Sequence, residues 1–206
     1  MNSRSTQRFV GLVVAAVVSV LLLIALPAKE RERAPREQEL AASEPELSVF
    51  ELQDGWWVLP RHGVRMRLPP GWEPRENQSR PYAYRDLSAA LAGNLNVLSL
   101  PNFFNLDLEG IAEENRKSLE AAAVLELISL ADHRLGGDHP ALRIDYGGSP
   151  RGEELHFAAI VFLHGPDQVV ITAAATAEQW PVIEEDVRAS LESIELLAPP
   201  QAAPGE

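Results

Sequence analysis

The pattern of apolar and polar positions divides the chain into successive segments. Residues 9–26 form an apolar run without a charge, and Ser19 is its most polar side chain. As a helix this run would be roughly 27 Å long, close to the hydrocarbon thickness of a bilayer. Residues 27–46 are rich in Glu, Arg, Ala and Pro, which predicts a charged linker. From residue 47 onward, short apolar runs alternate with Gly, Pro and Asp turns, which predicts a folded domain.

We expect this domain to span residues 47–197. Its first half begins with short strands. Residues 64–68 alternate apolar and arginine side chains, which predicts a half-buried strand that ends at Pro69. Further short strands are predicted at residues 82–84 and 96–100. From Leu108 to Ala122 the apolar residues repeat at helical spacing, which predicts a helix with Asp107 as its N-cap.

The second half predicts four strands followed by a helix. Short Gly/Pro/Asp turns join the strands, which is typical of an antiparallel meander; the strands cover residues 124–133, 141–146, 155–163 and 169–175. The third strand is apolar at nearly every position, as expected of a central strand covered on both faces. Thr176 and Gln179 have the spacing of a capping box for the second helix. Residues 198–206 are expected to be a flexible tail. The element order predicts an α+β domain.

The apolar run at residues 9–26 is expected to be a retained, single-pass transmembrane anchor. Signal-peptide cleavage needs small residues at positions −1 and −3, and cutting after Ala28 or Ala25 would place Leu26 or Leu23 at −3. Without cysteine, a lipoprotein anchor is excluded. Basic residues lie on both sides of the run and do not decide its orientation. The short basic head at residues 1–8 is typical of an export signal, so the domain is expected outside the cytoplasm.

The charge of the chain narrows the range of partners. The whole chain has a formal net charge of −12, and the part after residue 40 contains 26 Asp and Glu against 12 Lys and Arg, a net charge of −14. Sequence-independent nucleic-acid binding needs clustered cations, so this balance argues against it. It also argues against the domain lying flat on an anionic lipid surface.

Several phrases of the sequence, in their order, resemble the PsbP-like superfamily, which includes the DcrB- and LpqN-related bacterial proteins. They are RLPPGWEP at residues 67–74, DLEGIAEENRKSLEA at 107–121, LGGDHPALRIDY at 135–146 and LHFAAIVFLHGPDQVVITAAAT at 155–176. The resemblance implies an α/β/α sandwich with an antiparallel sheet between helices. It implies binding or assembly work, with no shared reaction and no catalytic motif to carry over to this chain.

Candidate catalytic groups are few. Two Asp-His pairs flank the Gly-Gly turn at residues 136–137, and His with carboxylates can bind zinc; the pairs are Asp132-His133 and Asp138-His139. Adjacent residues of a strand point to opposite faces, and Asp beside Gly is ordinary turn chemistry, which weakens the metal hypothesis. Ser149 lacks the second glycine of a nucleophile elbow, because Arg151 stands there. The absence of cysteine excludes thiol catalysis.

Adjacent aromatic residues are the stronger candidates for binding. Trp56-Trp57 and Phe103-Phe104 are such pairs, and in a strand one member of each pair faces away from the core. An outward aromatic side chain can anchor a partner protein. The alternative is that both sheet faces are covered and both members are buried.

The sequence therefore predicts a non-catalytic, membrane-anchored binding or assembly module of the cell envelope, with its domain in the periplasm or at the cell surface. Its expected partners are the membrane, through residues 9–26, and another protein; no cofactor, metal or nucleic acid is expected. A cytoplasm-facing chaperone for a secreted or membrane client is the alternative. A metal-dependent hydrolase, built on the two Asp-His pairs, is the least favoured hypothesis.

Overall fold

The computed structural model describes residues 50–77, 80–85, 93–150 and 152–197 of the 206-residue chain. The chain divides into two units, Met1–Glu46 and Leu47–Glu206, and every described residue belongs to the second unit. The expected anchor, linker and tail lie outside the described residues. Among the helices of the described ranges, none combines the length and the apolar character that a membrane span requires.

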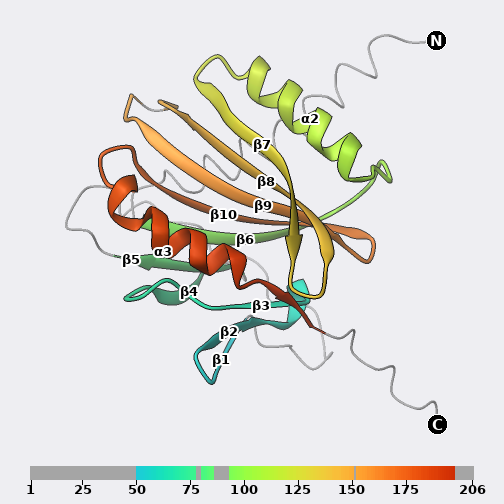
Figure 1. Ribbon diagram of the computed structural model, residues 1–206, viewed down its shortest axis with the longest axis vertical. Coiled ribbons are helices and arrows are strands. Elements are labelled where there is room, and N and C mark those ends of the chain that lie inside the picture. The colour runs from blue at the N-terminus through green and yellow to red at the C-terminus, as the bar shows by residue number, and fades with distance from the viewer. Residues whose placement is uncertain (1–49, 78–79, 86–92, 151, 198–206) are drawn as a thin grey trace, which may run out of the picture. The chain divides into compact units, whose positions relative to one another are not determined.

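Seven strands form one antiparallel sheet in the order β4-β5-β6-β10-β9-β8-β7 (Figure 1). Their bounds are β4 (Glu73–Asn77), β5 (Arg80–Arg85), β6 (Gly93–Pro101), β7 (Leu125–Leu135), β8 (His139–Gly148), β9 (Leu155–His164) and β10 (Asp167–Thr176). The run from β7 to β10 confirms the predicted meander. In β9, every residue of the range 157–162 is buried, which confirms a strand covered on both faces. Its unbroken apolar run is the pattern that such burial requires.

The helix α2 (Leu108–Ala121) carries the chain from β6, in the middle of the sheet, to β7 at its edge. The side chain of Asp107 accepts a hydrogen bond from the backbone N–H of Gly110 at 2.8 Å, which confirms the predicted N-cap. The helix packs on β7 and β8 and buries Ile111 and Leu119. In Figure 1, α2 lies alongside β7, whereas the second helix lies across β10.

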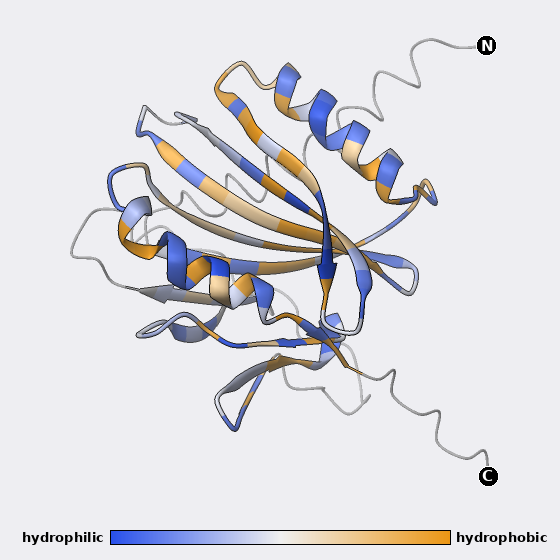
Figure 2. Cartoon of the chain, in the orientation of Figure 1, coloured by the Kyte–Doolittle hydropathy of each residue, from blue (hydrophilic) through white to orange (hydrophobic). Residues whose placement is uncertain are grey.

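The second helix, α3 (Trp180–Glu192), packs on β10. The apolar residues of this segment repeat at helical spacing and are all buried; they are Trp180, Ile183, Val187, Leu191 and, just beyond the helix, Ile194. Both helices show hydrophilic positions between their hydrophobic ones in Figure 2, as expected of helices with one packed face.

The predicted capping box at the start of α3 is wrong. Thr176 still pairs with Leu155 of β9, so it is the last residue of a strand and the helix begins only at Trp180. The Thr176 hydroxyl does accept a hydrogen bond from the backbone N–H of Gln179. A capping box also needs the Gln179 side chain to accept a hydrogen bond from the backbone N–H of Thr176. That bond is missing, because within the described residues the buried Oε1 of Gln179 has no hydrogen-bond partner.

A second, four-stranded sheet was not foreseen. Its order is β1-β2-β3-β11, with β1 (Glu51–Gln53), β2 (Trp56–Leu59), β3 (Val64–Met66) and β11 (Glu195–Leu196), and the short 3-10 helix η2 (Pro60–His62) joins β2 to β3. Four of its buried side chains share one core cluster with α3 and with one face of the large sheet; they are Trp57, Leu59, Val64 and Met66. Neither Ile111 nor Leu119 of α2 belongs to that cluster. The sandwich implied by the resemblance therefore has a helix and a small sheet together in one outer layer.

Candidate functional site

The strand β2 separates the two adjacent tryptophans. Trp57 is fully buried in the core, where its ring meets that of Phe50 edge to face at 6.3 Å between centroids. Trp56 is only half-buried and points to the other side of the strand. The sequence left open whether one member of the pair faces outward or both are buried. In this pair one side chain is inside and one is outside. Trp56 is thus the member of the pair that remains partly accessible.

Two arginines of the neighbouring segment cover the ring of Trp56. The guanidinium carbons of Arg65 and Arg67 lie over the ring, 4.6 and 4.4 Å from its centroid. Contacts of this kind stabilise by about 0.5–1 kcal/mol at exposed sites. Arg65 also donates two hydrogen bonds to one carboxylate oxygen of Glu195, at 2.8 and 2.6 Å. We call Trp56, Arg65 and Arg67 the arginine–tryptophan stack.

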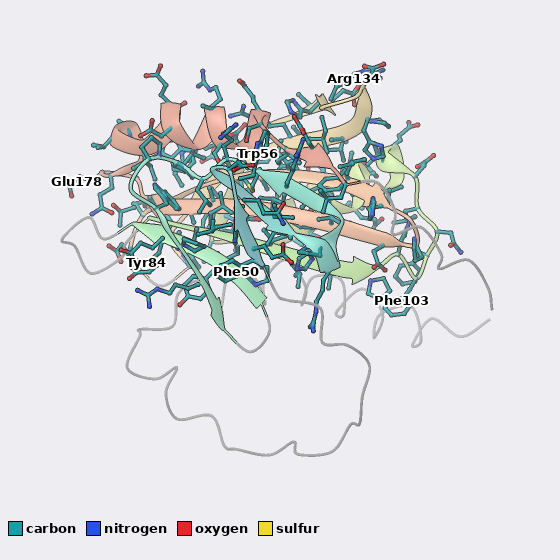
Figure 3. The ribbon with its side chains drawn as sticks, turned by 90° about the horizontal axis from the view of Figure 1, so that it is seen from below. Phe50, Trp56, Tyr84, Phe103, Arg134 and Glu178 are labelled. Carbon is teal, nitrogen blue, oxygen red and sulfur yellow. The ribbon has the colours of Figure 1, made fainter. Side chains whose placement is uncertain are left out.

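Phe103 and Phe104 lie in a turn between β6 and α2. The sequence argument that one member of each pair faces outward applies to a strand, but β6 ends at Pro101 and both side chains are exposed. Phe103 is 75% exposed and Phe104 is 51% exposed. The labels in Figure 3 show that Phe103 and Trp56 occupy separate parts of the surface.

Hydrogen bonds from Asn102 order this turn. The Asn102 side chain donates to the carbonyl of Leu106 at 2.8 Å and accepts from the Leu106 N–H at 3.1 Å. Its backbone N–H donates to the carbonyl of Pro166 at 2.9 Å, which ties the turn to the loop between β9 and β10. Asn105 has a left-handed φ of 49°, a conformation that asparagine tolerates well. We call residues 102–106 the aromatic turn, and its exposed phenylalanines are held on an ordered backbone.

A histidine–serine pair joins η2 to β6, and no local pattern indicates it because the two residues are 37 positions apart. Nδ1 of His62 lies 2.6 Å from the hydroxyl of Ser99. Burial, and then the positive charge of Arg61, lower the pKa of His62 to about 4, against a smaller opposite effect of Asp167. A histidine beside a serine is part of many nucleophilic sites, but an imidazole with this pKa is a weak base at neutral pH. The pair links η2 to the large sheet.

The structure does not bring the two Asp-His pairs together as a metal site. In the hairpin of β7 and β8, His133 is opposite Ala141, and His139 is opposite Leu135. His139 instead has its Nε2 2.9 Å from the carbonyl of Leu163. Asp132 and Asp138 are exposed, and Asp138 forms an ion pair with Arg134 at 3.1 Å.

The surroundings of His133 disfavour its charged form. Burial and the nearby charge of Arg143 lower the pKa of His133, with a smaller opposite effect from Glu192. Across the part of the chain that the structure describes, no three His, Asp or Glu side chains are placed so that they could hold a metal ion. Ser149, the other catalytic candidate, donates a hydrogen bond to Glu154 at 2.6 Å.

No family model and no curated protein matches the chain. Among solved structures, LpqN of Mycobacterium tuberculosis, which is involved in cell envelope biogenesis, matches with a TM-score of 0.51 at 13% identity, over 66% of this chain and 83% of LpqN. The cyanobacterial PsbP protein CyanoP of Synechocystis matches with a TM-score of 0.52 at 13% identity, over 75% of this chain and 98% of CyanoP. The PsbP-like fold implied by the sequence phrases is therefore confirmed.

Proposed function

We propose that this chain with a PsbP-like fold is a non-catalytic, membrane-anchored binding or assembly module of the cell envelope, with its domain outside the cytoplasm. The observation that carries the proposal is the exposure of both Phe103 and Phe104 on the hydrogen-bonded aromatic turn. Large apolar side chains grouped on an ordered surface are typical of a protein-binding site. Because one fold serves many functions, the proposal rests on this surface more than on the fold.

Two further observations support the cellular setting of the proposal. The uncharged run at residues 9–26 is long enough to cross a bilayer as a helix. LpqN, which shares the fold, is involved in cell envelope biogenesis. A linker of the composition of residues 27–46 would give the domain reach from the membrane.

We expect full-length protein to remain in the membrane fraction through carbonate and high-salt washes. An integral helix is held by its apolar burial, whereas washes of this kind remove proteins bound by charge. Fractionation followed by immunoblotting measures the outcome. Recovery of a soluble mature form that starts near Lys29 would contradict the anchor. Protection of the domain from protease added outside the cell membrane would favour the cytoplasmic chaperone instead.

We expect Phe103→Ala to weaken partner capture by about 1–3 kcal/mol, or roughly 5- to 150-fold in affinity, because truncation removes an apolar anchor. Phe104→Ala should act in the same direction. Neither change should lower domain stability by more than about 0.5 kcal/mol, since exposed side chains contribute little to folding. The measurement is the yield of a specific co-purifying protein from detergent-solubilised membranes.

Val182→Ala is the matched control for this experiment. Val182 is 68% exposed, as an apolar residue on α3, and it lies outside the aromatic turn. The control should capture as much partner as the unchanged protein. Equal capture by the Phe103 and Phe104 variants, with the fold intact, would show that the aromatic turn is not the binding surface.

A further inference from the structure

One segment of this acidic domain, which includes β2 and β3 of the small sheet, is basic. Residues 55–72 contain no Asp or Glu and carry three arginines, Arg61, Arg65 and Arg67, although the chain after residue 40 has a net charge of −14. Arg65 and Arg67 are two positions apart on an extended segment, so their side chains leave the same face. The arginine–tryptophan stack on that face is therefore a local positive site in a negative surrounding.

The backbone around the stack is shaped to hold Arg67. The turn between β1 and β2 has left-handed φ values at Asp54 (50°) and Gly55 (78°). A Cβ atom on Gly55 would lie 2.9 Å from Nη1 of Arg67, so glycine leaves room for the guanidinium group. That group donates a hydrogen bond to the carbonyl of Asp54 at 3.3 Å. The Arg67 side chain is thus held between the turn and the ring of Trp56.

The two arginines differ in how far their charge is neutralised. Arg65 forms an ion pair with Glu195 at 2.6 Å. Among the residues that the structure describes, no carboxylate pairs with Arg67, and Arg67 is exposed. Its contacts with Trp56 and the Asp54 carbonyl leave donors of the guanidinium free for another acceptor. A planar guanidinium that is already oriented favours a carboxylate, which it can bind through two parallel hydrogen bonds.

We propose that the arginine–tryptophan stack is a second docking surface, in which Arg67 binds a carboxylate side chain of an otherwise uncharged or basic segment of a partner protein. Charge complementarity selects this partner. A highly acidic protein or an anionic bilayer is repelled by the whole domain, whereas a single carboxylate meets the local positive site. The surface is separate from the aromatic turn, so the proposal goes beyond the function proposed above.

The test uses full-length protein in detergent micelles and two fluorescent peptides. One peptide is a Gly/Ser chain with a single central Glu residue, and the other is the same chain with Gln in its place. Fluorescence anisotropy should show binding of the Glu peptide, weakened about tenfold by Arg67→Gln, because one charge-assisted contact is lost. Added salt should weaken the binding as well.

Arg188→Gln is the matched control, because Arg188 is an exposed arginine on α3 that already pairs with Glu184. It should leave the affinity for the Glu peptide unchanged. The fold should survive Arg67→Gln, because two hydrogen bonds of the Arg67 backbone remain: its N–H donates to Ser193 and its carbonyl accepts from Ser190. A cooperative unfolding transition would verify this.

Three results would overturn the proposal. The first is equal binding of the Glu and Gln peptides. The second is unchanged Glu-peptide binding in the Arg67→Gln variant. The third is failure of the Glu peptide to bind while phosphatidylglycerol added to the micelles binds through Arg67, which would identify a lipid headgroup as the ligand. None of these results touches capture through Phe103, so the function proposed above would stand or fall separately.

Discussion

Trp57→Ala is expected to destabilise the domain by about 3–5 kcal/mol, because it removes a large aromatic side chain from a packed core and leaves a cavity. Trp57 is fully buried and belongs to the cluster that joins the small sheet to α3. Chemical denaturation, followed by circular dichroism, measures the free energy of unfolding. The adjacent Trp56 is partly exposed, which makes it the natural comparison.

Trp56→Ala, the matched substitution one residue earlier, should cost only about 1 kcal/mol. Trp56 is half-buried and loses mainly its contacts with Arg65 and Arg67. If the two variants were equally stable, the assignment of Trp57 to the core and Trp56 to the surface would be incorrect. If Trp56→Ala lowered the free energy of unfolding more than Trp57→Ala, Trp56 and not Trp57 would be the residue that faces the core.

The second large effect concerns pH and His62. Its pKa falls from an ordinary value of 6.5 to about 4 in the folded domain, chiefly because burial disfavours the charged imidazole. The unfolded chain therefore binds more protons than the folded domain between these two values, and stability rises with pH there. As the pH falls from 6.5 to 4, His62 alone should cost about 2–3 kcal/mol of stability.

His62→Asn isolates this contribution, because an asparagine side chain can still bond to Ser99 in place of Nδ1 but does not titrate. The free energy of unfolding of both proteins is measured at several pH values in this range. Carboxylates titrate in both proteins, so the difference between the two curves reports His62. A difference that does not change with pH would show that His62 is solvated and ordinary.

Local sequence patterns predicted those elements that local physics determines. The long apolar run of β9, the helical spacing of α3 and the N-cap at Asp107 each follow from neighbours within a few residues. The second sheet does not, because β3 pairs with β11 across the domain, where Arg65 is opposite Glu195. A two-residue strand such as β11 has no periodicity of its own, so its partner is set only by the tertiary fold.

The candidate site shows the same division. The sequence singled out Phe103 and Phe104 as an adjacent aromatic pair, of which a strand would turn only one outward. Turn chemistry at Asn102 places both outside instead. The register of β7 and β8 keeps His133 apart from His139, which a spacing argument alone does not resolve. The contact of Arg67 with Trp56 also depends on strand pairing and was not predicted.

The most direct measurement of the central claim is site-specific photo-crosslinking at the aromatic turn in intact membranes. A photoreactive phenylalanine analogue replaces Phe103 in the full-length chain, and in a matched control it replaces Val182, which is comparably exposed on α3. A binding module that docks through the aromatic turn predicts a discrete cross-linked protein for position 103 and none for position 182. No cross-link at position 103, or the same products from both positions, would contradict the account.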